Sequence, residues 1–81
     1  MSKFQTGDVV KYINPQNTFW KVGETHIIHE ISYIGKGTFE YSTNRGAWFN
    51  ESDFKLIRKA DKKSLAQLDK DLEEGEDEEY E

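Results

Sequence analysis

The sequence lacks cysteine entirely and contains a single proline and two histidines among its 81 residues. Without cysteine the chain can form neither a disulfide bond nor a thiolate metal site, so packing alone must hold the fold. No apolar run approaches the ~20 residues of a membrane span, and the first residues lack the apolar core of a secretion signal. These absences favour a cytoplasmic protein.

The short length also limits the chemistry that this chain can house. About sixty residues have a foldable composition, which allows one domain with a small core and leaves no room for a deep, walled active site. Ten of the eleven aromatic residues precede residue 60, so aromatic packing is expected to form that core. We therefore expect no catalytic function, no metal and no cofactor.

Charge, by contrast, is plentiful and unevenly spread. Residues 1–60 carry eight basic and six acidic side chains, a balance of +2, whereas residues 61–81 carry three basic and ten acidic ones, a balance of −7. The two balances sum to the overall net charge of −5. This division predicts a compact domain at 1–60 followed by a charged appendage.

Short runs rich in β-branched and aromatic residues predict five strands before residue 60. Glycine or asparagine turns separate them, and no segment has helical periodicity long enough for a crossover helix. The clearest alternation places Phe39 and Tyr41 on one face. The Ile-rich run has apolar residues of both parities, which indicates burial on both faces or a β-bulge near Glu30. The expected fold is mainly β, a five-stranded antiparallel small barrel with strands at 9–13, 25–34, 38–42, 47–49 and 54–57.

The order of these elements is similar to that of a known group of folds. Gly7-Asp8 opens the first predicted strand, Val10 and Tyr12 follow at alternate positions, and a polar turn at 50–53 precedes the last strand. This order resembles Src-homology-three-like (SH3-like) barrels, a broad group that includes KOW and Tudor domains, over residues 4–58. The resemblance implies a fold and no particular activity. KOW domains have a glycine in the second strand that this chain lacks, so their nucleic-acid and ribosomal roles are not transferred. The whole chain also resembles many small bacteriophage-encoded proteins.

The segment 61–74 predicts a short amphipathic helix. Ser64 and Gln67 fit a capping box, and three leucines form a stripe at helical spacing. A helix of about ten residues is too short to be stable alone, so it should fray unless its leucines dock. Gly75 is expected to end the helix, and the acidic tail at 75–81 is predicted to be disordered because it has many like charges and little apolar surface.

The acidic end has three interpretations that the sequence leaves open. It can keep the protein soluble, compete internally for the basic residues of the body, or dock on a basic partner. The leucine stripe favours docking, because a purely solubilising tail has no need for leucines in register.

His26 and His29 are the only hint of a metal or acid-base site. Positions three apart on a strand point to opposite faces, so the two imidazoles would not converge without a bulge. We interpret them as two partly exposed strand histidines.

Large aromatic residues outside the predicted strands are sharper candidates for binding. Phe19 and Trp20 lie in a long loop, and Trp48 lies near a turn. Such side chains either form a shallow groove for a peptide or a nucleotide base, or close the ends of the barrel.

Our leading hypothesis is a non-catalytic protein-interaction or regulatory module that binds a partner protein, such as one with a basic surface. Its expected contact residues are the loop aromatics and the leucine stripe: Phe19, Trp20, Trp48, Leu65, Leu68 and Leu72. The alternative is a single-stranded DNA- or RNA-binding domain that its own acidic tail restrains. That function would use Lys11, Trp20, Lys21, Lys36 and Arg45, although these cations are also compatible with a mixed, solvated surface.

Overall fold

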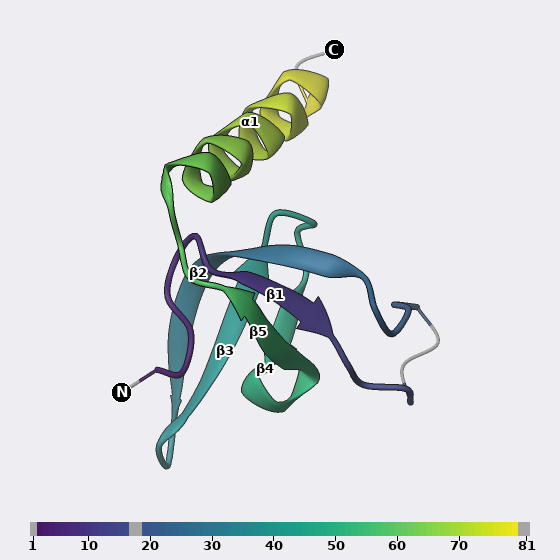
Figure 1. Ribbon diagram of the computed structural model, residues 1–81, viewed down its shortest axis with the longest axis vertical. Helices are drawn as coiled ribbons and strands as arrows, with labels where there is room; N and C mark the ends of the chain where they lie inside the picture. Colours follow the sequence, from purple (N-terminus) through teal and green to yellow (C-terminus); the bar gives the residue numbers. More distant parts are fainter. Residues whose placement is uncertain (1, 17–18, 80–81) are drawn as a thin grey trace.

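The computed structural model describes residues 2–16 and 19–79, with side chains of the C-terminal helix described to residue 73. Five antiparallel strands form a sheet in the order β4-β3-β2-β1-β5, and a helix follows (Figure 1). The predicted mainly-β fold with five strands and a C-terminal helix is confirmed. The elements are β1 (Val9–Tyr12), β2 (Thr25–Gly35), β3 (Thr38–Thr43), β4 (Trp48–Asn50), the 3₁₀ helix η1 (Glu51–Asp53), β5 (Phe54–Arg58) and α1 (Lys62–Glu79).

Strand β2 is long enough to pair with two neighbours. Its first residues pair with β1 and the remainder pairs with β3, with a shift of register between Ile28 and Ile31. The predicted bulge near Glu30 is therefore confirmed. Because one extra residue reverses the alternation, His26 and Ile28 lie in the interior before the bulge and Ile31 packs against the core after it.

The core is built largely from aromatic side chains. Its rings meet mostly edge to face, as between Phe4 and Tyr41 with centroids 5.2 Å apart. Phe39 packs against the core cluster that contains Tyr41, in agreement with their predicted shared face. The buried residues of this cluster are Phe4, Val10, Tyr12, Ile28, Tyr41, Phe49 and Phe54.

The hydroxyl of Tyr41 ties the N-terminal segment to η1. It donates to the Glu51 carboxylate and accepts the backbone N–H of Lys3 at 3.0 Å. Burial, then the hydrogen bond to Glu51, raises the pKa of Tyr41. Desolvation alone would raise the pKa of Glu51, but the hydrogen bonds from Tyr41 and Lys3 lower it overall. At neutral pH the Tyr41 hydroxyl therefore stays protonated and the Glu51 carboxyl stays ionised.

Helix α1 begins with a capping box one turn earlier than the sequence pattern predicted. Ser64 N donates to Asp61 Oδ1 at 2.8 Å, and Asp61 N donates to Ser64 Oγ at 3.0 Å. Ser64 therefore closes the box with Asp61, and the expected pairing with Gln67 is wrong. These bonds from Ser64 also lower the pKa of Asp61, which favours the charged form at this helix start.

The first turns of α1 pack on the sheet. Ser64 and Leu68 are 2% and 3% exposed. Gly7 allows this close approach, because a β-carbon there would lie 2.6 Å from Leu65 Cδ2 and its φ of +94° is rarely adopted by other residues. Asp8 Oδ1 also accepts the Ala60 N–H at 2.9 Å, which fixes the end of the body directly before the helix begins.

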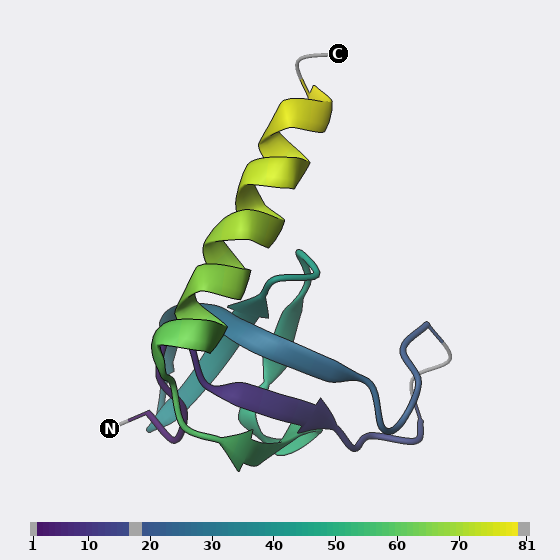
Figure 2. The same ribbon diagram turned by 45° about the horizontal axis from the view of Figure 1, so that its top comes forward.

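Beyond these turns the helix projects away from the sheet (Figure 2). It continues through Gly75, where the sequence predicted its end, and reaches Glu79. The predicted boundary at residue 74 is therefore not a break in the helix. The disorder expected for the acidic tail at 75–81 stays a prediction. Residues 80 and 81 lie outside the described residues.

Candidate functional site

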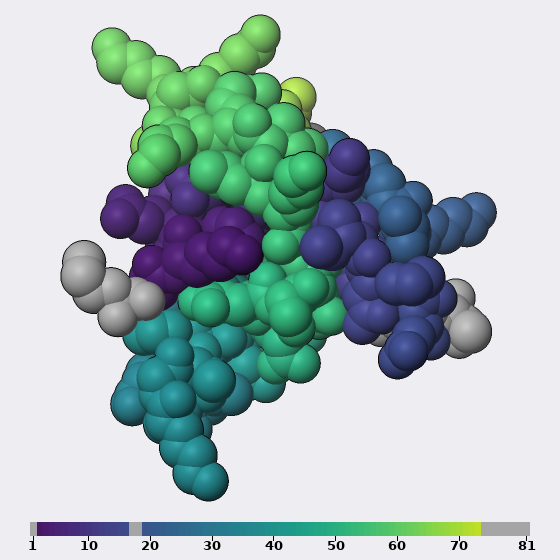
Figure 3. Space-filling view, turned by 60° about the horizontal axis from the view of Figure 1, so that its bottom comes forward, coloured from purple at the N-terminus to yellow at the C-terminus, as the bar shows by residue number. Residues whose placement is uncertain are grey.

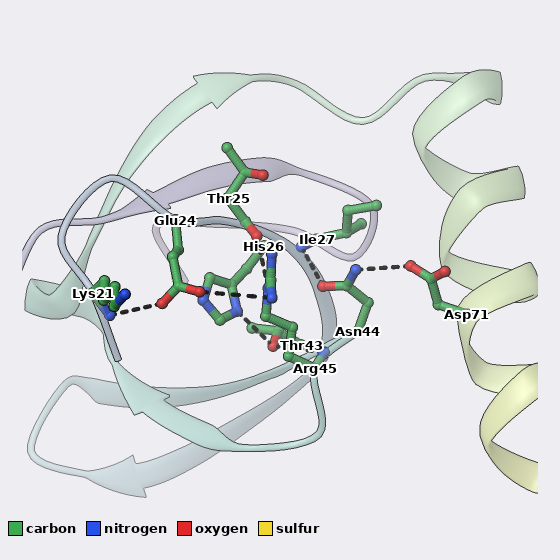
Figure 4. Close-up of polar contacts among 9 residues, drawn as sticks. All are labelled: Lys21, Glu24, Thr25, His26, Ile27, Thr43, Asn44, Arg45 and Asp71. Atoms are coloured by element: carbon green, nitrogen blue, oxygen red, sulfur yellow. Dashed lines mark hydrogen bonds and ion pairs between the residues drawn. The ribbon is translucent and has the colours of Figure 1, made fainter. Parts of the chain in front are cut away.

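The turn between β3 and β4 connects the sheet, the long loop and the helix (Figure 4). Asn44 Oδ1 accepts the Ile27 N–H at 2.9 Å, and Asn44 Nδ2 donates to Asp71 Oδ2 at 2.8 Å. One amide side chain therefore bridges β2 and α1. No periodicity or spacing in the sequence indicates this contact, because its partners lie far apart along the chain.

Arg45 extends the same cluster toward the loop. Its Nε donates to the Thr25 carbonyl at 3.0 Å, and its Nη1 lies 3.8 Å from Glu24 Oε2. Glu24 Oε1 accepts the Lys21 N–H at 2.7 Å. The guanidinium is thus held in position by the start of β2, although its side chain stays exposed.

His26 is buried, which corrects the expectation of a partly exposed histidine. Its side chain is 1% exposed and its Nδ1 lies 3.0 Å from Thr43 Oγ1. The ring sits among Trp20, Phe49 and Phe54, with centroids 5.1–5.3 Å away. Burial, together with the positive charge of Arg45, lowers the pKa of His26 from 6.5 to about 4. The imidazole is neutral at pH 7 and serves as part of the aromatic packing.

His29 is not part of the aromatic cluster around His26. Its side chain is half-buried, and its backbone carbonyl accepts a hydrogen bond from Thr6. Within residues 2–16 and 19–79, no group of three or more histidine, aspartate or glutamate side chains is placed to hold a metal ion.

The loop aromatics divide into an anchored and an exposed residue. Trp20 is partly buried against the core, with its ring 5.4 Å from that of Phe49. Phe19 is 80% exposed and meets Trp20 edge to face at 5.2 Å. Trp48, on edge strand β4, is 50% exposed. Phe19 and Trp48 are accessible for contact, whereas Trp20 closes one end of the core.

The leucine stripe is likewise divided. Leu68 is buried under the helix, Leu72 is half-buried and Leu65 is 42% exposed beside Gly7. The stripe therefore serves mainly to dock α1 on its own sheet. A partner can reach Leu68 only if the helix leaves the sheet.

The cations proposed for nucleic-acid binding lie on separate elements. Lys36 precedes β3, and Arg45 follows the opposite end of the same strand. Lys21 lies in the loop, and Lys11 lies on β1. Trp20 packs against the core, so its ring is only partly accessible to a base.

The cavities along the described surface include two of several hundred Å³. The first, of about 490 Å³, lies between α1 and the sheet. Its charged and polar lining residues include Arg45, Arg58, Lys63, Gln67 and Asp71. The second, about 440 Å³, lies between the β2–β3 hairpin and η1 and is lined by Ile34, Phe39 and Glu51 among others. The sequence patterns indicated neither, because each forms between segments distant in the chain.

Comparisons of the chain with protein-family models, with curated proteins and with solved structures give no match. In the described part of the chain, no helix combines the length and apolar composition needed to cross a membrane.

Proposed function

We propose that this protein is a non-catalytic binding module whose acidic helix end engages a partner protein with a basic surface. One observation carries the proposal: α1 is fixed to the sheet at Ser64 and Leu68, and its later turns project away from the body. Residues 69–81 contain nine acidic side chains and one lysine, a balance of −8. A segment of this charge carried on a rigid base can steer a basic partner toward the molecule.

The sheet provides the rigid base. We propose that it closes into a small SH3-like barrel, as the sequence resemblance implies. Strand β2 pairs on both sides, β5 returns to lie beside β1, and η1 precedes β5. These features support closure without implying any activity.

The same geometry disfavours internal competition by the tail. The projecting turns do not fold back over the sheet (Figures 1 and 2). We therefore favour a role for the acidic end toward other molecules. Phe19 and Trp48 remain exposed and can add apolar contacts to a partner that reaches the body.

The proposal is tested by neutralising the helix end in the full chain. The variant carries Glu73→Gln, Glu74→Gln, Glu76→Gln, Glu78→Gln and Glu79→Gln, which leave the docking residues unchanged. We expect the immobilised wild type to retain a basic protein from its native extract at 0.15 M salt, and the variant to lose it, because the attraction is mainly electrostatic.

A control variant removes two acidic charges from the sheet, by Glu30→Gln and Glu40→Gln, and should retain the same protein. Equal retention by all three proteins, or no basic protein retained by the wild type, would contradict the proposed role of the helix end.

A further inference from the structure

Although the chain is acidic overall, cations cluster in residues 55–63. Residues 55–63 run along β5, through a short linker and into the first turn of α1. They contain five basic side chains against one acidic residue, Asp61. We name as the basic strip these five residues and the lysine that faces them on β1: Lys11, Lys55, Arg58, Lys59, Lys62 and Lys63.

The strip is exposed and its lysines are not neutralised. All six side chains are exposed. The described side chains form two ion pairs, and only one involves the strip, between Arg58 and Asp61 at 3.2 Å. Figure 3 shows β5 and the linker as a continuous green band across one face. The strip thus carries about five uncompensated positive charges at neutral pH.

The register of the sheet places two lysines opposite each other, and their repulsion lowers the stability of the fold. Lys11 and Lys55 are direct partners across the antiparallel β1–β5 pair. Directly opposed like charges destabilise a sheet, and opposite charges or apolar pairs would stabilise it. A bound anion between the two ammonium groups would remove this repulsion.

The strip borders the cavity beneath α1. Arg58 and Lys63 belong to the strip and line this cavity of about 490 Å³, and Arg45 also lines it. The acidic group facing it is Asp71, whose two oxygens accept hydrogen bonds from Asn44 and Gln67. With the Asp71 carboxylate held by these two amides, the three cationic side chains of the recess suit a phosphate group.

We propose that the basic strip binds the sugar-phosphate backbone of a nucleic acid, with one phosphate in the recess beneath α1. A strand of five residues spans about 17 Å, and the linker and helix start extend the row of cations beyond it. An extended row of charges matches a polymer with regularly spaced anions better than a compact acidic protein.

The acidic helix end does not cancel this surface. From Lys63 the helix rises about 9 Å to Asp69 and about 15 Å to Glu73, so at physiological salt, where the Debye length is about 8 Å, the charges from Glu73 onward are largely screened from the strip. The exposed aromatic residues of the described chain, Phe19, Tyr33 and Trp48, lie on other elements. Binding should therefore use phosphates without base stacking and show no preference for sequence.

The test measures fluorescence anisotropy of a labelled 20-nucleotide oligothymidylate, with a mixed-sequence strand and a 20-base-pair duplex as parallel probes. We expect saturable binding by the full chain at 20 mM NaCl. If about four phosphates are contacted, the logarithm of the association constant should fall with the logarithm of salt with a slope of about −3 for single strands.

The key variant carries Lys55→Gln and Lys59→Gln, and its matched control carries Lys21→Gln and Lys36→Gln, which remove the same charge elsewhere. The strip variant should bind at least ~10-fold more weakly and lose about half of the salt slope, while the control stays within about two-fold of the wild type. Circular dichroism establishes that both variants are folded.

Three outcomes would overturn the proposal. These are no binding by the wild type at 20 mM NaCl, equal loss in the strip variant and its control, or displacement of the oligonucleotide by poly-glutamate at equal charge concentration. The last outcome would assign the strip to an acidic protein. None of them bears on the acidic helix end, whose proposed partner is tested separately.

Discussion

At the scale of single residues, His26 shows how a small core can hold a polar ring. It occupies a position among three aromatic side chains, and Thr43 lies within hydrogen-bond distance of one of its nitrogens. The sequence could not reveal this burial. The alternation of β2 reverses at the bulge, so His26 and Ile31 both face inward although their spacing is odd.

This burial predicts a loss of stability in mild acid. The unfolded chain binds a proton at His26 near pH 6.5, whereas the folded chain does so only near pH 4. The stabilising contribution is complete above pH 6.5 and is lost as the pH falls toward 4, amounting to about 3 kcal/mol. Urea unfolding of the wild type and of His26→Phe, measured between pH 7 and 4, checks this.

We expect His26→Phe to remove most of the difference between pH 7 and pH 4, and His29→Gln, the matched histidine control, to keep it. Glu51 and Asp61, whose pKa values are lowered, lose their own contributions mainly below this pH range. An unchanged pH dependence in His26→Phe would show that folding leaves the pKa of His26 unshifted, which would contradict the prediction.

At the scale of elements, helix α1 is the part that the sequence predicted least well. The leucine spacing correctly indicated an amphipathic helix, but the pattern could not distinguish a partner's surface from the chain's own sheet. The capping pattern was ambiguous because both Asp61 and Ser64 are good caps, and Asp61 lies nearer the end of β5. The bridge from Asn44 to Asp71 depends on tertiary structure alone.

The docking of α1 predicts that Leu65 and Leu68, neighbours in the leucine stripe, contribute unequally to stability. Leu68→Ala should destabilise the protein by about 2 kcal/mol, because it removes a buried side chain and leaves a cavity under the helix. Leu65→Ala should cost less than about 1 kcal/mol, since that side chain is 42% exposed.

Thermal and urea unfolding of the two variants measure this difference directly. Equal effects of the two substitutions would mean that the helix does not rest on Leu68 in solution.

At the scale of the whole molecule, charge is arranged by structure rather than by order along the chain. Division of the sequence at residue 60 predicted a mildly basic body and an acidic appendage. The structure instead joins cations from both sides of that boundary into one strip, because β5 lies beside Lys11 and runs directly into α1. The molecule therefore presents a basic edge and, along the same helix, an acidic end.

This polarity requires that α1 has two parts with different behaviour. The first turns are held by Ser64, Leu68 and Asn44. The later turns carry many like charges, which disfavour a helix that gains nothing from packing. The strip and the acidic end act on different molecules only if the base of the helix stays docked and its end stays free.

Native-state amide hydrogen exchange along α1 of the full chain tests this division most directly. We predict that the amides of residues 65–72 are protected with the same opening free energy as the core strands, and that those after Gly75 exchange at nearly the rate of an unfolded chain. Unprotected amides at 65–72, or full protection continuing to Glu79, would contradict the account.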